Sequence, residues 1–137
     1  MKNLNKVYWL KKEIEQITDQ IKELTMYSGT NLSGMPSAHN NESMVERYIL
    51  KKDKLLEKLE EKFAELVTEV QRIEEFIEGI DDAEIRVIAR KRFIENKDWQ
   101  DIGDEMYMDR TTVSRKMKKY LERFEQENDD DGIDRTI

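Results

Sequence analysis

Asp98-Trp-Gln-Asp-Ile-Gly103-Asp-Glu-Met-Tyr107-Met-Asp109-Arg-Thr-Thr-Val-Ser-Arg-Lys-Met-Lys-Lys-Tyr-Leu-Glu-Arg-Phe124 is the stretch that decides the fold. Asp98 and Asp109 each precede an amphipathic segment, and aspartate is a preferred N-cap because its carboxylate accepts from the free N–H groups of the first turn. Gly103 stands where a second helix must cross closely, so that a side chain there would clash. The stretch therefore predicts a helix-turn-helix whose turn is Met106-Tyr107-Met108.

The second of these helices has two different faces. At 3.6 residues per turn, one stripe is apolar and is expected to pack inward; it consists of Val113, Met117, Tyr120, Leu121 and Phe124. The rest carries basic and hydroxyl side chains. These are the candidate DNA-binding residues: Arg110, Thr111, Thr112, Ser114, Arg115, Lys118 and Lys119. A helix with a packed back and a basic front suits the DNA major groove.

Each candidate has an expected role. Arg115 can reach guanine O6 and N7 with two hydrogen bonds. The hydroxyls of Thr111, Thr112 and Ser114 can bond base edges or phosphates. The remaining cations are expected on phosphates, which position the protein without specifying sequence; they are Arg110, Lys118 and Lys119. The alternative for the whole set is a solvated basic face.

A third helix is predicted before this pair. Asp81 or Asp82 caps it, and it runs to about Glu95. Its inward residues are expected to be Ile85, Ile88, Ala89 and Phe93. Its basic residues, which could touch phosphates, are Arg86, Arg90, Lys91 and Arg92. Residues 81–124 thus form a three-helix helix-turn-helix unit.

Residues 1–80 are predicted to form a long antiparallel helical hairpin of coiled-coil type. The first helix, Leu4 to Tyr27, has apolar residues at alternating spacings of three and four, which is a heptad pattern. Ser43 opens a capping box for the second helix, which runs to about residue 80. Between them, residues 28–42 are rich in Gly, Ser and Asn and predict a loop, with His39 exposed in it.

The second helix has more apolar surface than a two-helix seam uses. Four residues widen the stripe: Tyr48, Leu55, Val67 and Phe76. This surface must be covered by the third helix or by another subunit, so we expect a homo-oligomer, with a dimer favoured. The alternative is a solvated hairpin that packs only against itself.

Charge is distributed unevenly along the 137 residues. The formal net charge is −7, but residues 86–123 hold 11 basic and 7 acidic side chains, whereas the remainder holds 13 and 24. The basic region therefore coincides with the predicted helix-turn-helix. Residues 125–137 are acidic and nearly free of apolar side chains, so they are predicted to be disordered. No apolar run approaches the roughly 20 residues of a membrane span, and a cytoplasmic protein without membrane contact is expected.

Residues Ile85 through Leu121 resemble region four of sigma factors, which reads promoter elements with a helix-turn-helix. The resemblance rests on the Asp101-Ile102-Gly103 step, Asp109 at the cap, and Thr112-Val113 entering the second helix. Residues 1–124 combine two long helices, a loop carrying Ser33-Gly34-Met35-Pro36, and a sigma-like helix-turn-helix with Trp99 opening its second helix. This layout is similar to phage and prophage late-gene activators of the RinA and ArpU type. This resemblance implies an activator of phage late genes in the bacterial host cell, with double-stranded DNA and host RNA polymerase as partners. One departure is Tyr107, where such families often carry glycine in a left-handed conformation.

Two other classes of function stay open. A small terminase subunit also pairs a helix-turn-helix with an oligomerising helical region, although its DNA-binding unit is usually N-terminal. A coiled-coil adaptor without DNA binding is the other. An enzyme is not expected, because there is no cysteine, one histidine and no glycine-rich phosphate loop. For the same reasons no cofactor and no metal site are expected.

Overall fold

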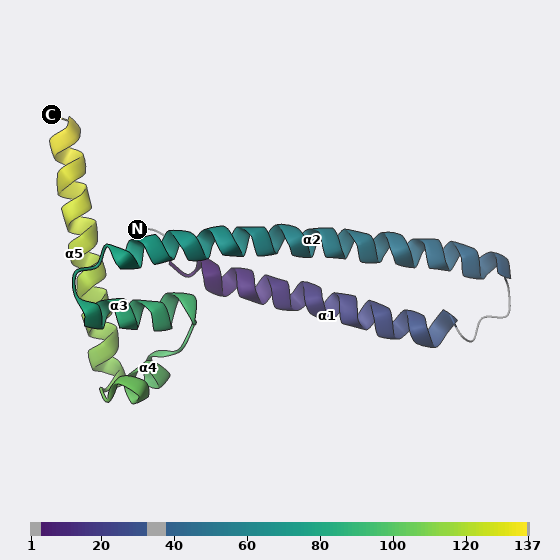
Figure 1. The fold of residues 1–137 in the computed structure, drawn as a ribbon, viewed down its shortest axis with the longest axis horizontal. Coiled ribbons are helices and arrows are strands. Elements are labelled where there is room, and N and C mark those ends of the chain that lie inside the picture. The colour runs from purple at the N-terminus through teal and green to yellow at the C-terminus, as the bar shows by residue number, and fades with distance from the viewer. Residues whose placement is uncertain (1–3, 33–37, 137) are drawn as a thin grey trace. The chain divides into compact units, whose positions relative to one another are not determined.

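The computed structural model describes the backbone of residues 4–32 and 38–136, and the side chains of 4–26 and 43–128. The described chain is all-α, which confirms the predicted fold class. Its elements are α1 (Lys6–Leu32), α2 (Ala38–Glu78), α3 (Ala83–Ala89), the π-helical turn η1 (Arg90–Ile94), α4 (Trp99–Met106) and α5 (Arg110–Thr136) (Figure 1). Among the described helices, none is both long and apolar enough to cross a membrane.

The described chain divides into two compact units. Residues up to Tyr8 and from Glu69 onward form one, here called the C-terminal unit, and Trp9–Thr68 form the other, the helical arm. The sequence instead places the boundary after residue 80. The end of α2 joins the C-terminal unit because its apolar side chains are buried there together with the start of the chain. These core residues are Leu4, Val7, Ile73, Ile77 and Ile80.

In the helical arm, α1 and α2 run alongside each other in opposite directions (Figure 1). Lys62 of α2 lies 3.1 Å from the Glu13 carboxylate of α1. This hydrogen bond is the main reason that the pKa of Lys62 is raised. Leu10 and Ile17 are buried, as the heptad pattern predicts.

The two long helices extend into the predicted loop 28–42. α1 continues to Leu32 and α2 begins at Ala38. His39 therefore lies in α2 and not in a loop, and Ser43 lies inside α2 instead of capping it; residues 33–37 are outside the described residues. Serine, threonine and asparagine cost less than about 0.7 kcal/mol each in a helix, and extending an existing helix is far easier than nucleating one. Turn-forming composition thus overstated the length of the connection.

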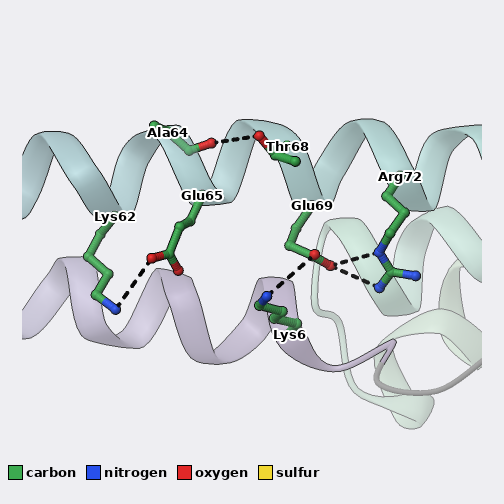
Figure 2. A network of polar contacts seen from close by, with 7 residues as sticks. All are labelled: Lys6, Lys62, Ala64, Glu65, Thr68, Glu69 and Arg72. Carbon is green, nitrogen blue, oxygen red and sulfur yellow. Dashed lines mark hydrogen bonds and ion pairs between the residues drawn. The ribbon is translucent and has the colours of Figure 1, made fainter.

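A buried carboxylate joins the start of α1 to α2. Glu69 accepts from Arg72 Nη2 at 2.9 Å, and its other oxygen lies 3.6 Å from Lys6 Nζ (Figure 2). The hydrogen bond from Arg72, helped by Lys6, lowers the pKa of the Glu69 carboxyl. A carboxylate that is buried but doubly matched by cations avoids most of the penalty of an isolated buried charge.

The C-terminal end differs from the prediction. Residues 125–137 are predicted to be disordered, but α5 continues to Thr136, and Ile137 lies outside the described residues. The packed first half of α5 supplies the nucleus, after which each further residue adds one backbone hydrogen bond. An acidic composition weakens tertiary packing more than it weakens helix extension.

Candidate nucleic-acid interface

The helix that precedes the predicted helix-turn-helix begins as predicted and ends differently. Asp82 accepts from the Glu84 N–H at 2.9 Å and so caps α3. Instead of an α-helix to Glu95, the chain widens at η1, where the Glu95 N–H donates to Arg90 O at 3.0 Å, five residues back. Asn96 then takes a left-handed conformation, with φ of 60°. The predicted inward residues are buried: Ile85, Ile88, Ala89 and Phe93.

α4, the first helix of the predicted helix-turn-helix, is fixed by one N-cap and one glycine. The Asp98 carboxylate accepts from the Asp101 N–H at 2.8 Å. Ile102 is fully buried. A Cβ at Gly103 would stand 2.5 Å from the backbone oxygen of Met108, closer than real Cβ atoms approach. The clash expected at Gly103 is confirmed, but the backbone that lies close to it is the turn after α4 and the first residue of α5, whereas a crossing helix was expected.

The turn between α4 and α5 is the tight left-handed one, with tyrosine in place of glycine. Tyr107 has φ 57° and ψ 44°. Its N–H and that of Met108 both donate to the Gly103 carbonyl, the latter at 2.9 Å. The ring is 96% exposed, so no packing offsets the steric cost of this conformation. Tyr107 therefore takes the left-handed conformation that such families often give to glycine, at a steric cost.

The inner face of α5 packs as predicted. Val113 and Met117 are buried. Phe124 meets Phe76 of α2 edge-on, with 5.0 Å between ring centroids, and Tyr120 lies 6.3 Å from the same ring. Phe76 therefore packs against α5 within its own chain and is only partly exposed. Burial is also the largest cause of the raised pKa of Tyr120.

All seven predicted DNA-binding residues lie in the first turns of α5, and none of them is buried. Thr112 and Ser114 are half-buried, and the Ser114 hydroxyl donates to the Thr111 carbonyl at 3.2 Å. The other five are exposed: Arg110, Thr111, Arg115, Lys118 and Lys119. None of the four cations among them forms an ion pair with any described residue, whereas Arg90, Lys91, Lys97 and Lys116 of the same unit do.

Most cations on the helix before α4 hold the unit together. Arg90 bonds Glu78 at 2.6 Å and Glu74 at 3.3 Å, so it ties η1 to the end of α2. Arg86 donates to the Ile80 carbonyl. The sequence predicts that Arg86, Arg90, Lys91 and Arg92 could touch phosphates. All four have partners within the chain, and for Arg92 these are the Lys97 carbonyl and the Trp99 ring.

A second cluster of charges ties the turn after η1 to α4. Glu105 accepts from Lys97 at 2.6 Å and from Lys91 at 3.3 Å. The hydrogen bond from Lys97 is the largest cause that lowers the pKa of the Glu105 carboxyl, and it likewise raises the pKa of Lys97. On the other side, Lys116 of α5 pairs with Glu84 of α3 at 2.5 Å. These pairs orient the helices around α5.

No metal chemistry is evident in the described part of the chain, which holds no cluster of three or more His, Asp or Glu side chains placed to bind an ion. What the site does offer is a helix, exposed on one side, with unpaired cations and hydroxyls on that side.

Comparison with known proteins finds a family whose model covers most of the chain. A family model described as "Protein of unknown function (DUF722)" matches residues 8–126. No curated protein matches the chain. No solved structure matches it either.

Proposed function

We propose that this chain, which belongs to the DUF722 family of proteins of unknown function, is a sequence-specific regulator of transcription that binds double-stranded DNA. One observation carries the proposal: four exposed cations in the first turns of α5 form no ion pair with described residues, while the turn into α5 closes tightly over Gly103 of α4. An α-helix with its side chains is about 10–12 Å across, and the major groove of B-DNA is about 12 Å wide. The outer face of α5 has the dimensions and charge for that groove.

In this account the first turns of α5 read the DNA. Arg115 bonds guanine O6 and N7, which only the major groove presents together. Thr111 lies one turn before it on the same face, and Lys118 lies one turn after it, where it meets a phosphate. Glu122 follows on that face and is exposed. Its carboxylate repels phosphates, so the reading surface ends near Lys119.

We further propose that the helical arm joins two copies of the chain. Ile49, Leu56 and Phe63 repeat every seven residues along α2 and are 49%, 40% and 47% exposed. Val67, one turn beyond Phe63, is 59% exposed. A heptad stripe that one partner helix leaves uncovered is the feature by which coiled coils associate. A dimer would present two copies of α5 to two half-sites, as dimeric helix-turn-helix proteins do.

The proposal is tested by electrophoretic shift of fragments from the native genome at 50 mM and 200 mM salt. We expect a subset of fragments to stay bound at the higher salt while the rest are released, because base contacts lose less to counterions than phosphate contacts do. Release of every fragment alike would contradict sequence specificity. No shift at either concentration would leave the adaptor as the better account.

The native mass of the same preparation separates the regulator from the small terminase. A dimer agrees with the regulator. A ring of eight or more copies would favour DNA packaging. A monomer at micromolar concentration would contradict the proposed dimer. DNA binding would then still be decided by the electrophoretic shift.

A further inference from the structure

Two grooves flank α5 within the C-terminal unit, and their charges differ. The first, here called the Trp99 groove, has a volume of about 630 Å³ and three cations but no carboxylate in its wall. Its wall consists of Asn5, Arg92, Phe93, Trp99, Ser114, Arg115, Met117, Lys118 and Leu121. The second lies on the opposite side of α5 and is lined by three cations and four carboxylates. Only the Trp99 groove has an uncompensated positive charge.

Arg92 is held in place at this groove before any ligand arrives. Its guanidinium carbon lies 4.5 Å from the centre of the Trp99 ring, and its Nη1 donates to the Lys97 carbonyl at 3.1 Å. Stacking on an indole fixes the plane of the guanidinium. Arginine has five N–H donors in that plane, and this is the one hydrogen bond that it makes to described residues. The remaining donors are therefore oriented and available.

The position of the groove identifies its ligand. Arg115 and Lys118 belong both to its wall and to the outer face of α5. When a helix lies in the major groove, a phosphate backbone runs along each of its flanks. A concave, positively charged surface beside such a helix meets one of those backbones, and arginine binds a phosphate through paired N–H donors.

We propose that the Trp99 groove seats a phosphodiester of the DNA strand on this flank, with Arg92 and Lys118 as its ligands. The inference rests on the proposed function and adds to it a backbone contact outside α5. The opposite groove is less favourable for a phosphate, since its four carboxylates outnumber its three cations and one of these cations, Lys116, is paired with Glu84. The two DNA strands are thus held unequally.

The test measures how DNA affinity depends on salt for Arg92→Gln and for Lys116→Gln, which removes the same charge on the opposite flank. Each phosphate neutralised contributes about 0.9 to the slope of log K against log salt. We expect Arg92→Gln to make this negative slope shallower by about 0.9 and Lys116→Gln to leave the slope unchanged. Equal slopes for wild type and Arg92→Gln would overturn the proposal.

A second pair of variants leaves the Arg92 contacts intact. Asn5→Asp adds a negative charge to the groove wall at a residue just before α1, where aspartate caps as well as asparagine. Gln71→Glu adds the same charge at an exposed position of α2. We expect Asn5→Asp to weaken binding about fivefold at low salt, from Coulomb repulsion of a nearby phosphate, and Gln71→Glu to weaken it far less. Equal effects would overturn the proposal.

The two proposals fail in different ways. Wild-type protein that binds no DNA would remove both. If the wild-type protein binds specific fragments, but Arg92→Gln leaves the salt slope unchanged and Asn5→Asp leaves the affinity unchanged, only the groove contact is contradicted.

Discussion

Cations in the C-terminal unit fall into two groups that the sequence does not distinguish. Those on α3, on η1 and in the turn before α4 are bonded within the chain, as Arg90 is to Glu74 and Glu78. Those on the outer face of α5, such as Arg115 and Lys118, have no ion pair with described residues. In this unit, therefore, one group of cations stabilises the packing of the helices through bonds within the chain. The other group, on α5, remains available to bind a ligand.

The largest effect on stability is expected from a substitution at Gly103, where the turn into α5 lies close to α4. Gly103→Ala places a Cβ 2.5 Å from the Met108 oxygen, so α4 and the turn must separate. We expect a loss of roughly 3 kcal/mol in the free energy of unfolding, measured by denaturant titration, with DNA binding lost in parallel. Gly79→Ala is the control, because its Cβ meets its nearest neighbour at an ordinary 3.4 Å. Equal stability of the two variants would mean that the turn does not lie close to Gly103.

Next in size is the loss of a single base contact. Arg115→Ala should weaken binding to the preferred sequence by roughly 1–3 kcal/mol and relax preference at one position. Arg123→Ala, also at an exposed position of α5, is the control. Competition with singly substituted fragments measures the preference. A uniform loss over all fragments would make Arg115 a phosphate contact.

A smaller effect concerns the strained turn. Tyr107→Gly should stabilise the protein by about 1 kcal/mol, because glycine adopts the left-handed conformation without steric cost, less its greater entropy when unfolded. Thermal unfolding measures it. If Tyr107→Gly also weakens DNA binding, the exposed ring contacts DNA as well as closing the turn.

The smallest effect is the pH dependence of the stability that the Lys97–Glu105 ion pair contributes. Hydrogen bonding to Lys97 lowers the pKa of Glu105 in the folded state. The stabilisation is therefore complete above the unfolded pKa, about 4.3, and is lost as pH falls through the lower folded value. Wild type should unfold at a higher temperature than Glu105→Gln at pH 7, and the difference should vanish near pH 3. A difference that persists at pH 3 would exclude the ion pair as its source.

Sequence patterns that depend on local chemistry predicted most of the C-terminal unit. Asp82 and Asp98 cap helices as expected, and a side chain at Gly103 would clash with the backbone of the turn before α5. The seven candidate residues all lie on α5 and are at least partly exposed. Helical periodicity alone separates them from the buried stripe of that helix. Whether DNA contacts them stays a prediction.

What the sequence missed depends on contacts between distant residues. Nothing in the pattern separates Arg90, bonded to Glu74 sixteen residues away, from Arg92, stacked on Trp99. The π-turn η1 and the Trp99 groove are also invisible to periodicity, since both arise from packing. The long helices were underestimated because turn-forming residues lower helix propensity without preventing extension.

The most direct test of the central claim is dimethyl sulfate protection of a bound fragment, since this reagent methylates guanine N7 in the major groove and adenine N3 in the minor groove. With α5 in the major groove, wild-type protein should protect guanine N7 positions, and Arg115→Ala should lose protection at one of them. Protection confined to adenine N3, or a pattern that Arg115→Ala leaves unchanged, would contradict the account.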